Sequence, residues 1–348
     1  MCFWSGSNNP IHREHLKIIR SLYELTMNGK RFFDQIVVCT TDNPEKYSDK
    51  SYLQKVIRQL MFEIACNNFF TDDEKRVITV DDTYDSLYSG ITFAEYLTVN
   101  KYNHVPMIVY EDGHAIKCYQ KLDGSGLPMR FYFAYGQDSA YDVHTWSSLC
   151  ANSLLSNVTG FIMFPRSECK SKPVIKREGE TYYGMKTIYV PTLKQNLMIY
   201  EKQEKQEMTK TFDKLQQVYP QKYTAEFVSD IVKSQHLDEM TKTVDESYVM
   251  TIIHDIKLDN TSSSVVRILL AHYQTQTEIE DLKSEYRSFA AKKPNEYNNI
   301  LNRFGLLESE NSIDSLIAID RVLIGDELVK MMTEPVFKFA VEKEVFKL

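Results

Sequence analysis

Residues 2–15 decide the fold, and they run Cys2-Phe3-Trp4-Ser5-Gly6-Ser7-Asn8-Asn9-Pro10-Ile11-His12-Arg13-Glu14-His15. A short apolar run ends in a turn of small residues, which predicts a buried strand and then a helix that starts near Pro10 or Ile11. Gly6 lets backbone N–H groups come close to an anion, and the helix directs its positive end to the same place. His12 and His15 add two imidazoles. The stretch therefore predicts a phosphate site at a strand-to-helix junction.

The segments that follow alternate between helix and strand patterns. Apolar residues recur at helical spacing over 14–28 and 52–67, and a further helix is expected over 92–100. Apolar runs predict buried strands, and these cover 33–39, 76–80, 131–135, 157–164 and 250–256. A turn between 105–110 and 115–119 predicts a hairpin. The alternation indicates an α/β fold, a Rossmann-like doubly wound parallel sheet.

A second strand-to-helix junction lies at Asn260-Thr261-Ser262-Ser263-Ser264-Val265-Val266-Arg267. Serines directly before an apolar run are typical of helix N-caps, so a helix is expected from here through Leu270. Arg267 stands one turn into that helix. Because both junctions follow predicted strands, both helix N-termini can lie at the carboxyl edge of one sheet, where open α/β sheets bind ligands. A polyphosphate is the ligand that fits between them.

These two junctions resemble the two signatures of the nucleotidyltransferase superfamily. Gly6-Ser7-x-Asn9-Pro10-x-His12-x-x-His15 resembles the first, and Ser262-Ser263-Ser264-x-Val266-Arg267 resembles the second, usually written S-S-T-x-I-R. Landmarks between them resemble those of the nicotinamide/nicotinate mononucleotide adenylyltransferases: Arg58 with Met61, Asp82-Thr83-Tyr84-Asp85-Ser86, Gly136-Gln137-Asp138 followed by Trp146, and Arg166. The resemblance implies the nucleotidyltransferase variant of the doubly wound fold.

The resemblance also implies a reaction. The 5′-phosphate of the mononucleotide attacks the α-phosphorus of ATP, pyrophosphate leaves, and NAD or its deamido form results. Such a transfer depends on positioning and charge neutralisation. The implied catalytic residues are His12, His15 and Arg267, and the implied ATP-binding residues are Gly6, Ser7, Lys46, Gly136, Asp138, Ser262 and Ser263, with Lys50 as the alternative to Lys46. Mg²⁺ accompanies ATP with few protein ligands, and no residue is assigned as a direct metal ligand.

For the mononucleotide, the resemblance implies that Tyr84 and Trp146 stack on the nicotinamide ring, that Thr92 contacts its substituent, and that Arg166 binds as well. From the residues alone, the two aromatics can equally be core residues, and Asp138 can equally be a helix cap. The sequence leaves open whether the substrate is the amidated or the acid form.

Two positions depart from the family pattern. The family usually has an aromatic residue where Asn8 stands, and bacterial members have glycine where Glu14 stands. Glu14 brings a carboxylate close to bound phosphates unless the helix turns it outward, as its place between the two histidines suggests. Whether full activity survives these two differences is open at this stage.

Composition bounds the other possibilities. The chain has 348 residues, with 43% hydrophobic and 26% charged residues, as in a soluble globular protein, and no apolar run is long enough for a membrane helix. The opening Met1-Cys2-Phe3-Trp4 is too short for a signal peptide, and the six cysteines form no C-x-x-C pair, so we expect a cytoplasmic protein, with a nuclear location left open. A net charge of −7 opposes a broad nucleic-acid surface.

We expect a transferase domain over 1–271 with insertions at about 101–128 and 170–248, and a helical C-terminal region over 272–348 that packs on it. The insertion at 170–248 and the segment 275–330 have no assigned role, and they leave open an oligomer interface or a partner surface. Two other functions stay open: adenylyl transfer to another phosphorylated acceptor such as phosphopantetheine, and a catalytically silent nucleotide-binding regulator.

Overall fold

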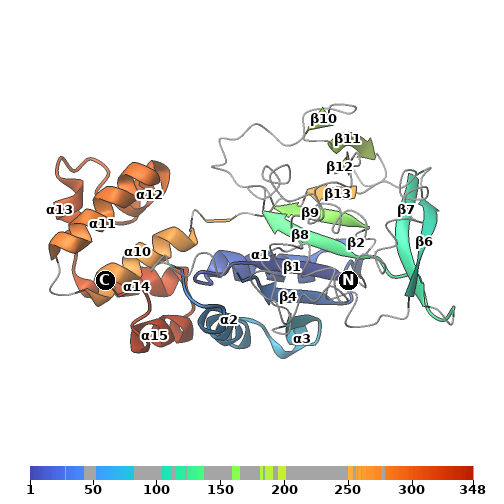
Figure 1. Cartoon of the computed structure of the whole chain (residues 1–348), viewed down its shortest axis with the longest axis horizontal. Helices are drawn as coiled ribbons and strands as arrows, with labels where there is room; N and C mark the ends of the chain where they lie inside the picture. Colours follow the sequence, from blue (N-terminus) through green and yellow to red (C-terminus); the bar gives the residue numbers. More distant parts are fainter. Residues whose placement is uncertain are drawn as a thin grey trace, which may run out of the picture. The chain divides into compact units, whose positions relative to one another are not determined.

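The computed structural model describes residues 1–27, 29–42, 52–81, 104–111, 114–121, 124–136, 159–164, 181–182, 185–190, 195–200, 250–253, 256, 258–259, 261–275 and 279–347 (Figure 1). The chain divides into two compact units. The first comprises Met1–Gly6, Leu22–Pro44 and Val77–Ile256, and the second comprises Ser7–Ser21, Glu45–Arg76 and Lys257–Leu348. The chain therefore crosses between the units several times, first at the peptide bond between Gly6 and Ser7.

The first unit contains a six-stranded sheet in the order β13-β9-β8-β1-β4-β5, and every pairing in it is parallel. Its strands are β1 (Cys2–Gly6), β4 (Ile36–Thr40), β5 (Ile78–Asp81), β8 (Tyr132–Gly136), β9 (Gly160–Phe164) and β13 (Met250–Ile253). Counted along the chain, this is the order 3-2-1-4-5-6 of a doubly wound nucleotide-binding sheet. The predicted Rossmann-like α/β fold is confirmed.

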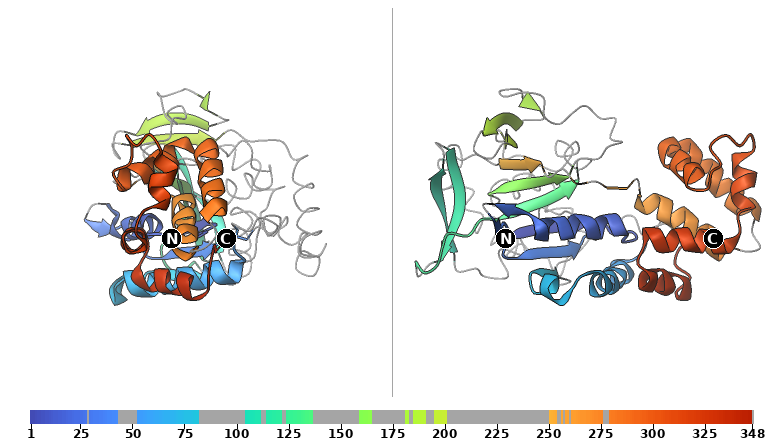
Figure 2. Two further views of the ribbon diagram at one scale, coloured as in Figure 1. Left: turned by 90° about the vertical axis from the view of Figure 1, so that its left-hand side faces the viewer. Right: turned by 180° about the vertical axis from the view of Figure 1, so that it is seen from behind.

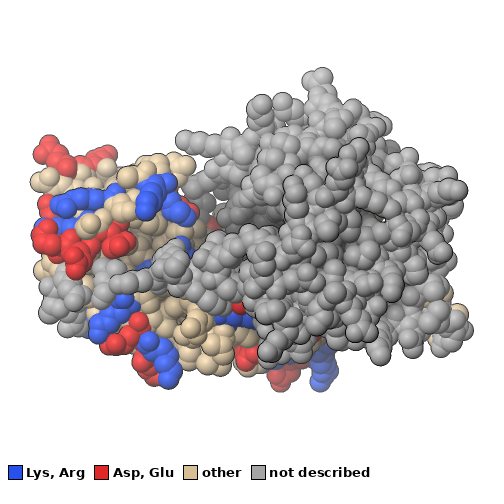
Figure 3. Space-filling model, in the orientation of Figure 1, with Lys and Arg blue, Asp and Glu red and all other residues tan. Residues whose placement is uncertain are grey.

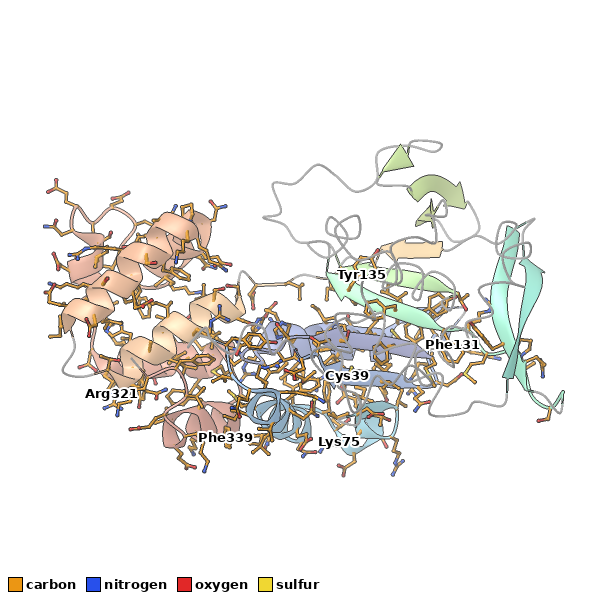
Figure 4. The ribbon with its side chains drawn as sticks, viewed as in Figure 1. Cys39, Lys75, Phe131, Tyr135, Arg321 and Phe339 are labelled. Carbon is orange, nitrogen blue, oxygen red and sulfur yellow. The ribbon has the colours of Figure 1, made fainter. Side chains whose placement is uncertain are left out.

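The strands form because their sequences are almost continuously apolar, as in parallel sheets covered on both faces. All five residues of β4 are buried, and so are the first four of β8. The rings of Phe3 and Phe133 lie 5.8 Å apart on neighbouring strands. Cys39 of β4 and Tyr135 of β8 (Figure 4) are buried as well, with exposed fractions of 0% and 4%. Burial raises the pKa of the Cys2 thiol to about 12, so this cysteine is an inert part of the core.

The strand order reverses between β1 and β8. Their pairing stops at Trp4 and Ala134, whereas each continues two residues further with its outer neighbour, β1 with β4 to Gly6 and β8 with β9 to Gly136. The carboxyl ends of the two central strands are therefore level and no longer paired to each other. This topological switch point is where doubly wound sheets bind ligands.

The second unit is helical. It contains most of α1 (Arg13–Glu24), together with α2 (Lys55–Phe69), α3 (Asp72–Lys75), α10 (Ser263–Gln274), α11 (Ile279–Lys292), α12 (Pro294–Arg303), α13 (Ser312–Ile317), α14 (Arg321–Met331) and α15 (Glu334–Glu342). Helix α10 packs against α11, α12, α14 and α15, and α15 packs against α2 (Figure 2). The C-terminal helices thus gather around α10, whose buried face includes Val265, Val266, Leu269 and Leu270.

The remaining described strands lie outside the six-stranded sheet. Strands β6 (His104–Glu111) and β7 (His114–Lys121) form the predicted antiparallel hairpin. Strands β10 (Thr181–Tyr182), β11 (Met185–Val190) and β12 (Gln195–Tyr200) form a small antiparallel sheet. The helix expected over 92–100 lies outside the described residues.

Helix α1 differs from its predicted bounds at both ends. It begins at Arg13 rather than near Pro10 or Ile11, because the N–H groups of His15 and Leu16 reach back only to the carbonyl of His12. It ends at Glu24 rather than at residue 28, because β2 (Thr26–Met27) pairs with β3 (Lys30–Arg31) around Gly29, whose φ is +73°. A tight hairpin therefore replaces the last predicted turn of helix.

The predicted polar helical region over 275–303 contains two helices, divided where Pro294 occupies the first turn of α12. Among the described residues, none of the helices is both long enough and apolar enough to cross a bilayer.

Candidate functional site

The first motif forms an irregular loop whose carbonyl groups are held by side-chain donors. Arg58 donates to the carbonyl of Ser7, Arg267 Nη1 donates to that of Asn9 at 2.6 Å, and Ser263 Oγ donates to that of Pro10 at 3.0 Å. In a trans peptide the next N–H group points away from the carbonyl, so the N–H groups of residues 8 and 11 face the opposite side. The donors thereby fix which side of the loop presents N–H groups.

The positive φ in this loop belongs to Asn8, at 47°, and asparagine tolerates this left-handed region better than most side chains. The residue is 2% exposed. The peptide bond between Asn9 and Pro10 is cis. An aromatic residue at position 8 would raise the conformational energy of this left-handed backbone. The backbone conformation therefore explains why asparagine stands here.

Arg58 joins the loop of the first motif to the segment that precedes α2. Its side chain is fully buried, donates to the carbonyls of Ser7 and Leu53, and lies 4.6 Å from the centre of the Tyr52 ring. The N–H group of Leu53 in turn donates to Asn9 Oδ1 at 3.2 Å. The sequence singles out Arg58 as a family landmark, and its contacts identify it as a positioning residue for the first motif.

His12 and His15 lie together at the start of α1. His12 is 3% exposed and precedes the helix, whereas His15 is half-buried in its first turn. Their rings stack with centroids 3.8 Å apart at an angle of 28°. The backbone N–H of His12 donates to His15 Nδ1 at 3.4 Å, which in a neutral ring places the proton on Nε2. His15 therefore presents Nε2–H as a donor.

The second motif begins α10 as predicted. Ser262 is the N-cap, and its Oγ accepts a hydrogen bond from the N–H of Val265 at 3.3 Å. Because Ser262 acts there as an acceptor, its own hydroxyl proton stays available. Ser263 differs, since its proton is used on Pro10. Arg267 contacts Asn9 and, through Nη2, Ser264 Oγ at 3.3 Å. The structure thus brings the two motifs into direct contact.

Glu14 is buried rather than turned outward to solvent. It is 5% exposed, lies 2.8 Å from Lys17 Nζ, and accepts a hydrogen bond from the N–H of Asp259 at 2.6 Å. Lys17 also donates to the Asp259 carboxylate at 2.6 Å, and this hydrogen bond holds the pKa of Asp259 below its ordinary value. The charge of Glu14 is therefore compensated by Lys17, and the three residues tie α1 to the segment that leads into the second motif.

Two residues of α12 and its cap also contact the second motif, and neither is among the site residues predicted from the sequence. Lys293 Nζ donates to Ser264 Oγ at 2.5 Å, and Arg303 Nη2 donates to Thr261 Oγ1 at 3.0 Å. Arg303 is itself paired with Glu327 of α14 at 2.5 Å. These contacts join residues about 30 to 40 positions apart. No local pattern signals them, except that Lys293 precedes a helix-starting proline.

The other expected site residues divide into two groups. Gly6 and Gly136 stand at the carboxyl ends of β1 and β8, and Ser7 opens the loop just described. Six expected residues lie outside the described part of the chain: Lys46, Tyr84, Thr92, Asp138, Trp146 and Arg166. Over the described ranges, no three His, Cys, Asp or Glu side chains are grouped so that they could hold a metal ion.

The fold is similar to two solved structures of Plasmodium falciparum nicotinic acid mononucleotide adenylyltransferase. One, complexed with NaAD, is 15% identical with a TM-score of 0.40, and the match covers 81% of this chain and 88% of that chain. The other, complexed with APC, is 12% identical with a TM-score of 0.44, covering 99% and 96%. No protein-family model and no curated protein matches the sequence. The strand order of the six-stranded sheet identifies the doubly wound fold without these distant matches.

Proposed function

We propose that the protein is an adenylyltransferase that joins ATP to nicotinamide or nicotinate mononucleotide and releases pyrophosphate. One observation carries the proposal: two motifs about 250 residues apart are hydrogen-bonded directly, from Arg267 to the Asn9 carbonyl and from Ser263 to the Pro10 carbonyl. Each motif resembles a phosphate-binding signature, and their contact makes one donor-rich site of them. A site of this kind suits a triphosphate.

The proposed reaction is a direct displacement. An oxygen of the mononucleotide 5′-phosphate forms a bond to the α-phosphorus of ATP, and the bond from that phosphorus to the bridging oxygen of pyrophosphate breaks. Negative charge grows on the leaving pyrophosphate, so fixed donors aimed at it lower the barrier. We propose three donors for this role: His15 Nε2–H, the Ser262 hydroxyl and the Arg267 guanidinium.

The stacked histidines suit an anionic ligand. His15 presents Nε2–H as a donor, and the His12 ring is stacked against it with the centroids 3.8 Å apart, so a phosphate beside the pair accepts from a positioned imidazole. Ser263 has a different role in this proposal. Because its proton is directed to Pro10, it positions the first motif and does not donate to the substrate in this geometry.

Mg²⁺ is expected to enter with ATP, where it neutralises charge on the phosphate oxygens. The described carboxylates beside the motifs, Glu14 and Asp259, are both paired with Lys17. A phosphate-bound ion with few protein ligands fits this donor set, because Mg²⁺ is usually held by substrate phosphates, water and one or two carboxylates. We propose that Asp138 orients those waters or the ribose.

The mononucleotide is proposed to bind through Tyr84, Thr92, Trp146 and Arg166, with the two aromatics against the nicotinamide ring. Lys46 or Lys50 is proposed as a further phosphate ligand. These assignments depend on the sequence resemblance alone.

The test is direct. Purified protein with ATP, Mg²⁺ and either mononucleotide should release pyrophosphate and form the dinucleotide, which chromatography detects. Parallel reactions with nicotinamide mononucleotide, nicotinate mononucleotide and phosphopantetheine identify the acceptor. If the protein binds ATP but releases no pyrophosphate with any of the three acceptors, adenylyl transfer is rejected and a nucleotide-binding regulator is favoured.

A further inference from the structure

Ser264 receives two cationic donors on one oxygen. Its side chain is nine-tenths buried, with 9% of the residue exposed, and Oγ accepts from Lys293 Nζ at 2.5 Å and from Arg267 Nη2 at 3.3 Å. A hydroxyl has two lone pairs and one proton, so these two contacts use its whole accepting capacity. No described residue accepts the Ser264 proton. The remaining hydrogen-bonding group of this buried side chain is therefore a donor.

That donor is unusually strong. A hydroxyl that accepts hydrogen bonds from two cations is polarised by both, and its proton then favours an anionic acceptor. Ser264 also lies in the first turn of α10, where the helix dipole adds positive charge. Negative charge beside Ser264 is thus favoured by three features: the polarised hydroxyl, the two cations and the N-terminus of α10.

Lys293 has donor capacity left for such a ligand. Its ammonium carries three N–H groups, and one of them donates to Ser264 Oγ. The ammonium also forms an ion pair with Glu296 Oε2 at 3.2 Å, and it has no other partner among the described residues. Its side chain is 44% exposed, so a ligand can reach it. Lys293 is the N-cap residue of α12 and Pro294 follows it, which restricts the backbone from which the side chain extends.

Broad surface charge does not supply the attraction. On the face drawn in Figure 3, the described C-terminal helices carry basic and acidic side chains interleaved. Within α15, Lys338 is paired with Glu334 at 2.7 Å. Charges of both signs at similar spacing largely cancel beyond the Debye length. An anion bound at α10 therefore depends on the individual cations there.

We propose that Lys293 is a further phosphate-binding residue, which joins Arg267 and Ser264 in holding the terminal phosphates of a nucleoside triphosphate. The inference rests on the proposed function for the identity of the ligand. It assigns a direct role to the helical C-terminal region, because Lys293 comes from the junction between α11 and α12. It also assigns Glu296 the role of a competing anion that bound phosphate displaces from Lys293.

The competing roles predict effects of opposite sign. Lys293→Gln removes an attractive charge, whereas Glu296→Gln removes a competitor. Lys292→Gln is the matched control, since Lys292 is the adjacent, exposed lysine at the end of α11 and makes the same change in net charge. Lys293→Arg keeps the charge and the donors.

The experiment is calorimetric titration of the full chain and these variants with inorganic tripolyphosphate, ATP and adenosine, with thermal melts to check folding. Lys293→Gln should weaken tripolyphosphate and ATP binding by about tenfold, the usual size for a hydrogen bond to a charged group. Lys293→Arg should retain most of the affinity, Glu296→Gln should tighten binding, and Lys292→Gln should match the wild type. Adenosine, which lacks phosphates, should bind all variants equally.

Equal tripolyphosphate affinity for Lys293→Gln and Lys292→Gln would overturn the inference, and so would a parallel loss of adenosine binding. The two proposals fail separately. If tripolyphosphate binding depends on Lys293 but no acceptor is adenylylated, the inference stands and the proposed reaction is wrong. If the wild type transfers adenylyl groups and Lys293→Gln binds ATP normally, the proposed reaction stands and the inference about Lys293 is wrong.

Discussion

The two motifs reach the site by different physical routes. The first, residues 7–12, is an irregular loop whose carbonyl groups are held by side chains from two other segments, Arg58 from α2 and Arg267 and Ser263 from α10. The second, residues 262–267, is the N-terminus of a regular helix with its own capping serine. One motif is shaped by tertiary contacts, and the other is shaped largely by its own sequence.

This difference decides how each motif should respond to mutation. Substitutions far along the chain can deform the first loop, because its conformation depends on buried donors outside it. The second motif should keep its backbone when a donor is removed, since helix propensity and Ser262 maintain it. Stability and activity should therefore change together when a donor that holds the first loop is removed, and separately when a donor of the second motif is removed.

The largest expected effect is on catalysis, from His15→Ala. This change removes a donor proposed to stabilise the leaving pyrophosphate, so kcat should fall by about 100- to 1,000-fold, as for the loss of one preorganised donor. The unfolding midpoint should stay close to that of the wild type, because His15 is only half-buried. Steady-state kinetics and a thermal melt measure both quantities. Unchanged turnover would remove the proposed mechanism.

Arg58→Met should give the largest loss of stability. It removes the buried donor that the carbonyls of Ser7 and Leu53 share, and losing two hydrogen bonds from a charged group costs about 3 kcal/mol of unfolding free energy. Arg76→Met is the matched control, because Arg76 is 78% exposed in its pair with Asp73 and such pairs contribute little. Denaturant titration compares the two. Equal stabilities would mean that the first loop does not depend on its buried tether.

The two motifs also differ in how far their structure can be predicted from the sequence. Every strand of the six-stranded sheet is predictable, because a parallel strand covered on both faces requires an apolar run such as 36–40. The serine cap of α10 is predictable for a similar reason, since capping depends on neighbouring residues. Local rules therefore suffice for the sheet and the second motif.

The first loop does not follow local rules. Its helix starts three residues later than Pro10 suggests, and Asn8 takes a positive φ. The carbonyls of this loop are held by arginines 51 and 258 residues away in sequence. The contacts of Lys293 and Arg303 with the second motif are equally nonlocal. No periodicity encodes such contacts, and so the sequence reveals the residue types of the site but not their partners.

Acid should act on the helix of the second motif. Burial lowers the pKa of His272, in the last turn of α10, to about 4, against which a hydrogen bond to the backbone of Ile317 acts only partly. Tyr286 OH lies 3.0 Å from His272 Nδ1. Since the folded pKa is below the unfolded value of 6.5, the unfolded state binds more protons between these values. The contribution of neutral His272 to the unfolding free energy, up to about 3 kcal/mol, is therefore complete above pH 6.5. It is lost as the pH falls towards 4.

Denaturant titrations at about pH 7, just above this window, and at about pH 5.5 and 4.5, within it, measure the loss. His272→Gln keeps a polar side chain that does not titrate, so the part of the acid destabilisation due to this site should disappear in the variant. Identical pH dependence in both proteins would show that α10 is not sensitive to acid through His272.

The smallest effects separate capping from ligand binding at Ser262. Ser262→Ala should lower the unfolding free energy by about 1 kcal/mol, because the cap to Val265 is lost. Ser262→Asp should keep the stability of the wild type, since aspartate caps as well as serine and its charge suits the helix dipole. ATP affinity should follow the opposite order, because the aspartate repels bound phosphates, whereas alanine only lacks a donor. The less stable variant should thus bind ATP better, a ranking that calorimetry and denaturant titration test together. If Ser262→Asp binds ATP as well as the wild type does, the N-terminus of α10 does not face the triphosphate, and the second motif serves only to hold the first.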